Sequence, residues 1–175
     1  MPATLSQPSA VFWHDPWERT MTSSQPFAAV ASDLLRAVDA ALPKLRAISD
    51  SDAGQPRTAD VPDKWSPKQI IGHLIDSAAN NHQRFVRAQQ GPLNFPPYAQ
   101  NHWVDCQHYG DRPWADLLAF WEAYNRHLAH VIRHIPDDQQ GVPCTVESHD
   151  PVTLGFLVSD YVVHMRHHLA QLNAD

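Results

Sequence analysis

Residues 65–74 read WSPKQIIGHL, and this stretch carries the start signal of a long helix. Ser66 is a favourable N-cap residue, Pro67 suits the first helical position, and Gln69 stands where a capping box places its second side chain. Apolar residues then recur every three or four positions, which is the period of an amphipathic helix. A segment rich in glycine and proline ends the pattern. We therefore predict a helix from residue 67 to about residue 90.

Three further segments show the same helical period. They run from about residue 26 to 48, from 113 to 135 and from 153 to 173, and each carries a stripe of large apolar side chains on one face. Pro43 lies inside the first of them and should kink or shorten it. No segment alternates apolar and polar residues as a strand would. Four amphipathic helices predict an all-α fold, a four-helix bundle.

The segments between the predicted helices are long, over residues 49–64, 91–112 and 136–152. Crossover loops of this length are unusual in a simple bundle, so we expect them to cover or line a site. We predict a single bundle domain over residues 26–175, preceded by an N-terminal extension, residues 1–25, whose role is left open.

The composition excludes several classes of protein. The formal net charge is −6, and lysine and arginine occur singly, which argues against binding to nucleic acid. No apolar run approaches the roughly 20 residues that cross a bilayer, and the first thirty residues do not resemble a signal peptide. Cys106 and Cys144 fall in predicted loops, where a disulfide is conceivable but a reduced pair is the plainer reading. We expect a cytoplasmic protein.

The stretch HMRHHLAQL, residues 164–172, contains three of the twelve histidines of the chain. At about 100° per residue, His168 falls inside the apolar side of the last helix and His164 falls at its edge. His167 points about 100° away from His168, toward water. His164 and His168 therefore share the buried side at a spacing that lets two imidazoles reach one ion. The alternative is a pair of core-edge histidines with a purely structural role.

A polar line follows the border of the apolar face in the helix that starts after Ser66. It consists of His73, Ser77, Asn80 and Arg84. Such a line is costly unless its groups find partners, which a metal and a polar substrate in a central cavity would supply. The alternative is that it only packs against the long connection that follows.

The remaining histidines give no comparable site. We expect His82 to face solvent. A rival cluster on the third helix lies opposite the apolar stripe, where no wall would shape a substrate; it consists of His127, His130 and His134. Periodicity cannot place the loop histidines, which are His102, His108 and His149.

The set that remains is His73, His164 and His168. Three neutral imidazoles suit one divalent zinc, nickel or iron ion and leave a coordination position open. The chain has no HExxH motif, so it lacks the built-in glutamate base of many zinc peptidases. Asp76 is either an outer-sphere acceptor or proton carrier, or a solvated surface aspartate.

Three blocks of sequence resemble the DinB/YfiT-like metalloenzyme superfamily, and together they span residues 26–173. The first is GHLIDSAANNHQRF, which carries the family's pattern at His73, Asp76, Ser77, Asn80, Arg84 and Phe85. The second is PYAQNHW, with Pro97, Tyr98 and Trp103. The third is LGFLVSDYVVHMRHHLAQL, with His164 and His168.

This resemblance implies a four-helix bundle with a histidine-ligated divalent metal, a metal-dependent hydrolase activity and a homodimer. It implies that Tyr98 joins Asp76, Ser77, Asn80 and Arg84 around the substrate. Relatives in the wider superfamily transfer low-molecular-weight thiols such as bacillithiol or use mycothiol in isomerisation. A homodimer is also expected from the residues, because Trp13, Trp17 and Trp103 lie outside the core stripes.

We therefore carry three hypotheses about function. The first is a metalloenzyme acting on a small molecule, by hydrolysis if the metal activates water or by S-transfer if it activates a thiol. Arg84 and Asn80 would then hold an anionic or carbonyl group beside His73; no general base or other catalytic side chain can be assigned. The second is a non-catalytic metal- or ligand-binding module. The third, a DNA-damage protein, has only the superfamily's name in its favour.

Overall fold

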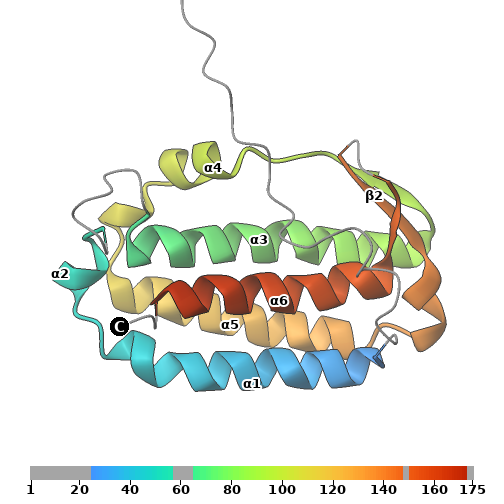
Figure 1. Cartoon of the computed structure of the whole chain (residues 1–175), viewed down its shortest axis with the longest axis horizontal. Coiled ribbons are helices and arrows are strands. Elements are labelled where there is room, and N and C mark those ends of the chain that lie inside the picture. Colours follow the sequence, from blue (N-terminus) through green and yellow to red (C-terminus); the bar gives the residue numbers. More distant parts are fainter. Residues whose placement is uncertain (1–24, 57–64, 148–149, 173–175) are drawn as a thin grey trace, which may run out of the picture.

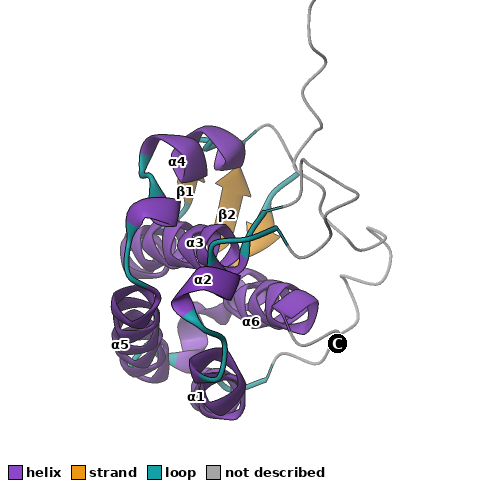
Figure 2. Cartoon of the chain, turned by 90° about the vertical axis from the view of Figure 1, so that its left-hand side faces the viewer, coloured by secondary structure: helices purple, strands orange, loops and turns teal. Residues whose placement is uncertain are grey.

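The computed structural model describes residues 25–56, 65–147 and 150–172, and four long helices dominate it. They are α1 (Phe27–Arg46), α3 (Pro67–Arg87), α5 (Trp114–Arg133) and α6 (Leu154–Leu172). Helices α1 and α3 each pack against both α5 and α6, so the four helices form a bundle around one core (Figures 1 and 2). The predicted all-α four-helix bundle is confirmed.

Helix α3 begins as its sequence predicts. The Ser66 hydroxyl accepts from the Gln69 backbone N–H at 3.3 Å, and the Gln69 side chain accepts from the Ser66 backbone N–H at 2.9 Å. This reciprocal capping box satisfies two of the N–H groups that a helix leaves open at its start. After Arg87 the chain makes a 3₁₀ turn, η2 (Ala88–Gln90), and Gly91 then adopts a φ of 128°, which favours glycine.

The other predicted helices are also present, with ends shifted by one or two residues. Pro43 does not stop α1, which continues to Arg46. Proline at this position has no N–H to donate to the carbonyl four residues earlier, so α1 loses one hydrogen bond but continues for one more turn.

The long connections contain structure that periodicity did not show. The connection from α1 to α3 contains α2 (Asp50–Ala53). The connection from α3 to α5 contains η2, β1 (Leu93–Phe95), α4 (Gln100–Cys106) and η3 (Tyr109–Asp111). The connection from α5 to α6 contains η4 (Asp137–Gly141), β2 (Pro143–Val146) and β3 (Val152–Thr153).

A small sheet ties two of these connections together at one end of the bundle (Figure 1). β1 pairs in parallel with β2, in the register Leu93 to Cys144, and β2 pairs antiparallel with β3. The expectation of no strands was therefore wrong, because strands this short cannot show a two-residue alternation. The loop assignment of the cysteines was wrong as well: Cys106 ends α4 and Cys144 lies in β2, and both thiols are free.

The core is filled by the apolar stripes of the four helices. The largest fully buried side chains include Trp121, Phe27 and Phe85. Two buried polar contacts cross between helices: Trp114 Nε1 donates to the Leu45 carbonyl at 2.9 Å, and the Tyr161 hydroxyl donates to Asn125 Oδ1 at 2.5 Å. These bonds satisfy groups whose burial would otherwise cost free energy.

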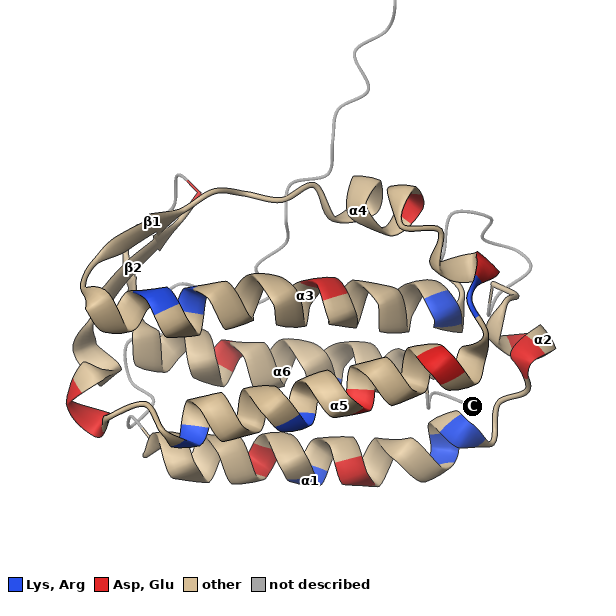
Figure 3. Ribbon diagram, turned by 180° about the vertical axis from the view of Figure 1, so that it is seen from behind, with Lys and Arg blue, Asp and Glu red and all other residues tan. Residues whose placement is uncertain are grey.

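Charged residues of both signs are spread along the helices in the view of Figure 3. No helix in the described parts of the chain is both long enough and apolar enough to cross a membrane. Trp13 and Trp17 lie outside the described residues, and Trp103 is half-buried with its ring centroid 5.1 Å from that of Tyr98. The homodimer and the lack of nucleic-acid binding therefore stay predictions.

The chain between α4 and α5 closes over the first half of α3. The Tyr109 ring lies directly on Gly72, where an added Cβ would overlap the ring atoms. Lys68, on the preceding turn of α3, donates to the Gly110 carbonyl at 3.5 Å and forms an ion pair with Asp50 at 3.1 Å. We call residues 107–111, which include Tyr109 and Gly110, the cover segment.

We predict that Gly72→Ala destabilises the protein. Alanine normally stabilises a helix interior relative to glycine by about 1 kcal/mol, but here the added methyl must displace the Tyr109 ring. Overpacking of this kind costs about 1–3 kcal/mol, so the free energy of unfolding in urea should fall. Gly141→Ala is the control, because a Cβ there meets nothing within 4 Å. An increase in stability for Gly72→Ala would contradict the close contact.

Candidate metal centre

Helices α3 and α6 bring His73, His164 and His168 together, as the sequence predicted. The Nε2 atom of His164 lies 3.3 Å from Nε2 of His73 and 3.2 Å from Nε2 of His168. The ring centroids of His73 and His168 are 4.7 Å apart. One nitrogen of each ring falls within 4.8 Å of the other two, and no second group of three histidine, cysteine or acidic residues comes this close within the described ranges.

The two helices expose these rings to different degrees. His73 is completely buried on the side of α3 that faces α6, and the Trp65 ring lies 4.9 Å from it. His164 and His168 lie one helical turn apart on α6 and are half-buried. The centre is therefore anchored in the core through His73, and its α6 side retains contact with solvent.

Burial keeps the three imidazoles neutral. It is the main cause that lowers the pKa of His73 to about 2 and that of His164 to about 3, and the neighbouring histidines lower both further. Burial also lowers the pKa of His168, against a hydrogen bond with Gln171 that raises it. Neutral rings offer the lone pairs that a metal needs, without having to lose a proton first.

The geometry fits a divalent transition metal. Ligand nitrogens placed tetrahedrally at about 2.0–2.1 Å from zinc lie about 3.3–3.4 Å apart. The two Nε2 separations of 3.3 and 3.2 Å are close to that value. Three Nε2 atoms that converge in this way cannot all be satisfied by one another, because each neutral ring has one donor and one acceptor nitrogen. The three rings thus fit a shared ion better than a set of mutual hydrogen bonds.

The structure decides between the two roles suggested for Asp76 only in part, and its role as an outer-sphere acceptor or proton carrier stays a prediction. Asp76 is 2% exposed, so the solvated surface aspartate is ruled out. Its Oδ1 atom accepts from the Tyr109 hydroxyl at 2.7 Å and from Gln107 Nε2 at 2.6 Å. Burial raises the pKa of Asp76, while these two bonds lower it. The cover segment explains the difference, because helical angle cannot show that another part of the chain lies over this side of α3.

The polar line on α3 is present, but its members have different surroundings. Ser77 reaches the centre, with Oγ 3.4 Å from His164 Nδ1. The Asn80 amide donates to the Asp76 backbone carbonyl at 2.9 Å. Arg84 shares this side of the helix, but it follows His73 by three turns, roughly 16 Å at 1.5 Å per residue. Arg84 is therefore not beside His73, because a helical angle carries no axial distance.

Two further polar residues are Tyr98, which lies between β1 and α4, and Asn81, which lies on α3. Tyr98 is half-buried against Trp103, and burial raises the pKa of its hydroxyl. Asn81 was not predicted, yet it is buried and its amide donates to the Ser77 carbonyl at 3.0 Å. Its helical angle, about 80° from His73, points into the apolar face. A polar amide at an angle that points into the apolar face needs buried hydrogen-bond partners, and this feature of the sequence could have identified Asn81.

The other histidines mostly lie where periodicity placed them. His167 is exposed, and so are His127, His130 and His134. His82 was wrongly assigned to solvent: it is half-buried, with Nδ1 3.2 Å from the Tyr124 hydroxyl and its ring 5.2 Å from that of His127. Its neighbours belong to α5, which a single-helix angle ignores. His102 and His108 are exposed, and His149 lies outside the described residues.

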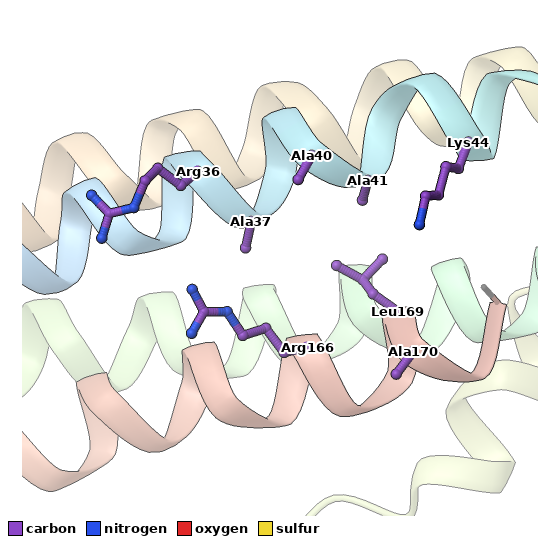
Figure 4. Close-up of a pocket in the computed structure, with 8 residues that line it drawn as sticks. All are labelled: Arg36, Ala37, Ala40, Ala41, Lys44, Arg166, Leu169 and Ala170. Carbon is purple, nitrogen blue, oxygen red and sulfur yellow. The ribbon is translucent and has the colours of Figure 1, made fainter. Parts of the chain in front are cut away.

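Two surface hollows in the described parts of the chain are separate from this centre. One of about 540 Å³ lies between α1 and α6 (Figure 4), lined by Arg36, Ala37, Ala40, Ala41, Lys44, Arg166, Leu169 and Ala170. Its two arginines both pair with Asp33, at 2.9 and 2.7 Å. The other, of about 590 Å³, is lined by Asn94, Phe95, Pro96, Pro97 and Glu147. None of the three histidines lines either hollow.

Comparison with known proteins agrees with this fold. YfiT from Bacillus subtilis, described as "a probable metal-dependent hydrolase with an unusual four-helix bundle topology", has a solved structure similar to this one. The TM-score is 0.78 at 20% sequence identity, over 92% of this chain and 90% of that chain. At this identity the likeness shows the fold alone.

A protein of Oceanobacillus iheyensis named "putative metal-dependent hydrolase" is 27% identical over 113 residues. The match covers 63% of this chain and 64% of that protein, which is less than two thirds of its length. The family model of the DinB superfamily matches residues 27–172, which include all four long helices and the three histidines. The chain therefore belongs to the DinB superfamily.

Proposed function

We propose that this chain is a divalent-metal-dependent hydrolase whose metal is held by His73, His164 and His168. The observation that carries the proposal is the convergence of three neutral imidazoles, with Nε2 atoms 3.3 and 3.2 Å apart. The descriptions of YfiT and of the Oceanobacillus iheyensis relative as metal-dependent hydrolases support it. The donor set suits zinc, nickel and ferrous iron.

A divalent ion bound here would supply a Lewis acid and would lower the pKa of a water molecule toward neutrality. His73 anchors the centre because its burial fixes the ring between α3 and α6. His164 and His168 hold the half-exposed side, from which a small substrate can approach. The neutral charge of the three ligands leaves the positive charge of the ion uncompensated, which favours the binding of electron-rich oxygen.

One observation favours S-transfer as a second candidate. Within the described residues, no carboxylate forms a hydrogen bond with any of the three histidines, and the Oδ1 atom of Asp76 accepts from Tyr109 and Gln107. A thiol loses its proton far more readily than water, with a pKa of about 8.5 against about 15.7. A site without an adjacent carboxylate base is therefore better suited to a thiol nucleophile than to a water nucleophile.

The two chemistries are separated by their dependence on a thiol. The protein would be loaded in turn with zinc, nickel and ferrous iron, and assayed with aryl esters and anilides, and with cysteine plus an electrophilic arene. We expect metal-dependent turnover of an ester or amide without thiol, lost in His73→Ala. Turnover only with thiol and electrophile would replace hydrolysis by S-transfer. The absence of turnover in every assay, with metal still bound, would indicate a non-catalytic metal-binding module.

We predict that metal binding requires all three histidines. His73→Ala, His164→Ala and His168→Ala should each abolish stoichiometric binding, because two imidazoles hold a divalent ion poorly. His167→Ala is the matched control: it neighbours His168 on α6, but its side chain is exposed. Elemental analysis after dialysis gives the metal content, and circular dichroism checks folding. Loss of metal in His167→Ala with retention in His168→Ala would contradict the site.

We also predict that the metal-free protein loses stability as the pH falls below about 6.5. His73 and His164 have pKa values of about 2 and about 3 when folded, against 6.5 as the ordinary value. Between these limits the unfolded chain binds more protons, so the free energy of unfolding decreases with falling pH. Each group contributes at most about 1.4 kcal/mol per pH unit.

Urea unfolding with chelator present, at pH 7.5, 6 and 5, would measure this slope. His73→Leu and His164→Leu should each flatten it, whereas substitution of the exposed His130 should not. A wild-type free energy of unfolding that does not change across this range would show that the rings are not buried in their neutral form.

A further inference from the structure

A chain of hydrogen bonds leads from the metal centre along α3. His164 Nδ1 lies 3.4 Å from Ser77 Oγ. The Asn81 amide donates to the same Ser77 Oγ at 3.4 Å, and Arg84 Nη1 donates to Asn81 Oδ1 at 3.4 Å. Ser77 and Asn81 are buried and Arg84 is half-buried, so most of this chain is shielded from water.

The chemistry of Arg84 sets the direction of these bonds. A guanidinium can only donate, so the Asn81 side chain must turn its carbonyl oxygen toward Arg84. Its NH₂ group then points toward Ser77, which agrees with its bonds to the Ser77 carbonyl at 3.0 Å and to Ser77 Oγ at 3.4 Å. One lone pair of the serine oxygen is thereby occupied by Asn81, and the other remains for His164.

A histidine that binds a metal ion through one ring nitrogen needs a hydrogen-bond acceptor for the proton on its other ring nitrogen. When His164 offers the Nε2 lone pair to an ion, its proton is on Nδ1, and that N–H needs an acceptor. Ser77 Oγ is the partner of Nδ1 in this structure. The other two histidines differ: His168 Nδ1 contacts Gln171 Oε1 at 3.2 Å, and His73 Nδ1 is buried and has no hydrogen-bond partner among the described residues.

We propose that Ser77 is a positioning residue, which holds the His164 ring with Nε2 toward the metal, and that Asn81 and Arg84 act through Ser77. The inference rests on the proposed metal site. It also assigns a character to that site, because a hydroxyl partner makes an imidazole less basic than a carboxylate partner would. A less basic ligand donates less charge, so the ion remains a stronger Lewis acid.

The first experiment measures metal binding without any substrate. The dissociation constant for zinc is obtained by chelator competition, and the visible d–d spectrum of the cobalt(II) form reports ligand geometry. Ser77→Ala should weaken zinc binding about 10- to 100-fold, the usual effect of losing such a partner, and should change the cobalt spectrum. Alanine is a good helix former, so the variant is expected to fold.

The control is Ser159→Ala on α6, which removes an exposed hydroxyl bonded to the Gly155 carbonyl at 3.0 Å. It should leave both readouts unchanged. If Ser77→Ala also leaves both unchanged while His164→Ala loses the metal, the role of Ser77 is overturned and the metal site stands. Retention of metal by His164→Ala would instead overturn the proposed function.

A double-mutant cycle tests the path through Ser77. Asn81→Leu, which is close in shape, should weaken zinc binding in the wild-type background by less than Ser77→Ala does. In the Ser77→Ala background the same change should have no further effect, because Asn81 no longer has an oxygen to orient. Equal losses in both backgrounds would show that Asn81 acts elsewhere, and would overturn this path.

Discussion

The burial of His73 is the constraint on which the rest of the structure depends. Its ring is completely enclosed in a core of apolar side chains, yet it carries two polar nitrogens. Burial without partners would cost several kcal/mol, and a buried positive charge would cost more. In the structure His164 Nε2 lies 3.3 Å from His73 Nε2, the His168 ring lies 4.7 Å from the His73 ring, and the His73 ring stays neutral, with Nδ1 unpaired among the described residues. The buried polar ring of His73 thereby becomes part of a group of three imidazoles that suits a metal ion.

The cover segment fixes the other side of α3. Gly72 allows the Tyr109 ring to lie on the helix backbone directly before His73, and the Tyr109 hydroxyl then reaches Asp76. These contacts hold α3 from outside the bundle, while α6 contacts it from inside. His73 is thus part of a helix that is held on two sides, which limits how far its ring can move.

Among the described residues, the side chains in contact with the three histidines are neutral. The hydrogen-bond partners of the outer nitrogens are a serine hydroxyl and a glutamine carbonyl, and the nearest buried carboxylate on α3, Asp76, faces the cover segment. An ion in such surroundings would attract electron density mainly from its own ligands and substrate. This character is compatible with both hydrolysis and S-transfer, and it distinguishes the centre from sites that contain their own carboxylate base.

The sequence by itself determined the four helices and the three histidines. Local signals were sufficient for these features: the capping box at Ser66 and Gln69 starts α3, and helical angle separates His168 from His167. Tertiary structure alone decided the short strands, the burial of Asp76, the partners of His82 and the contact between Ser77 and His164. The reason is physical. An angle around one helix gives the direction of a side chain, but it gives neither the axial distance to another site nor the identity of the segment that packs over it.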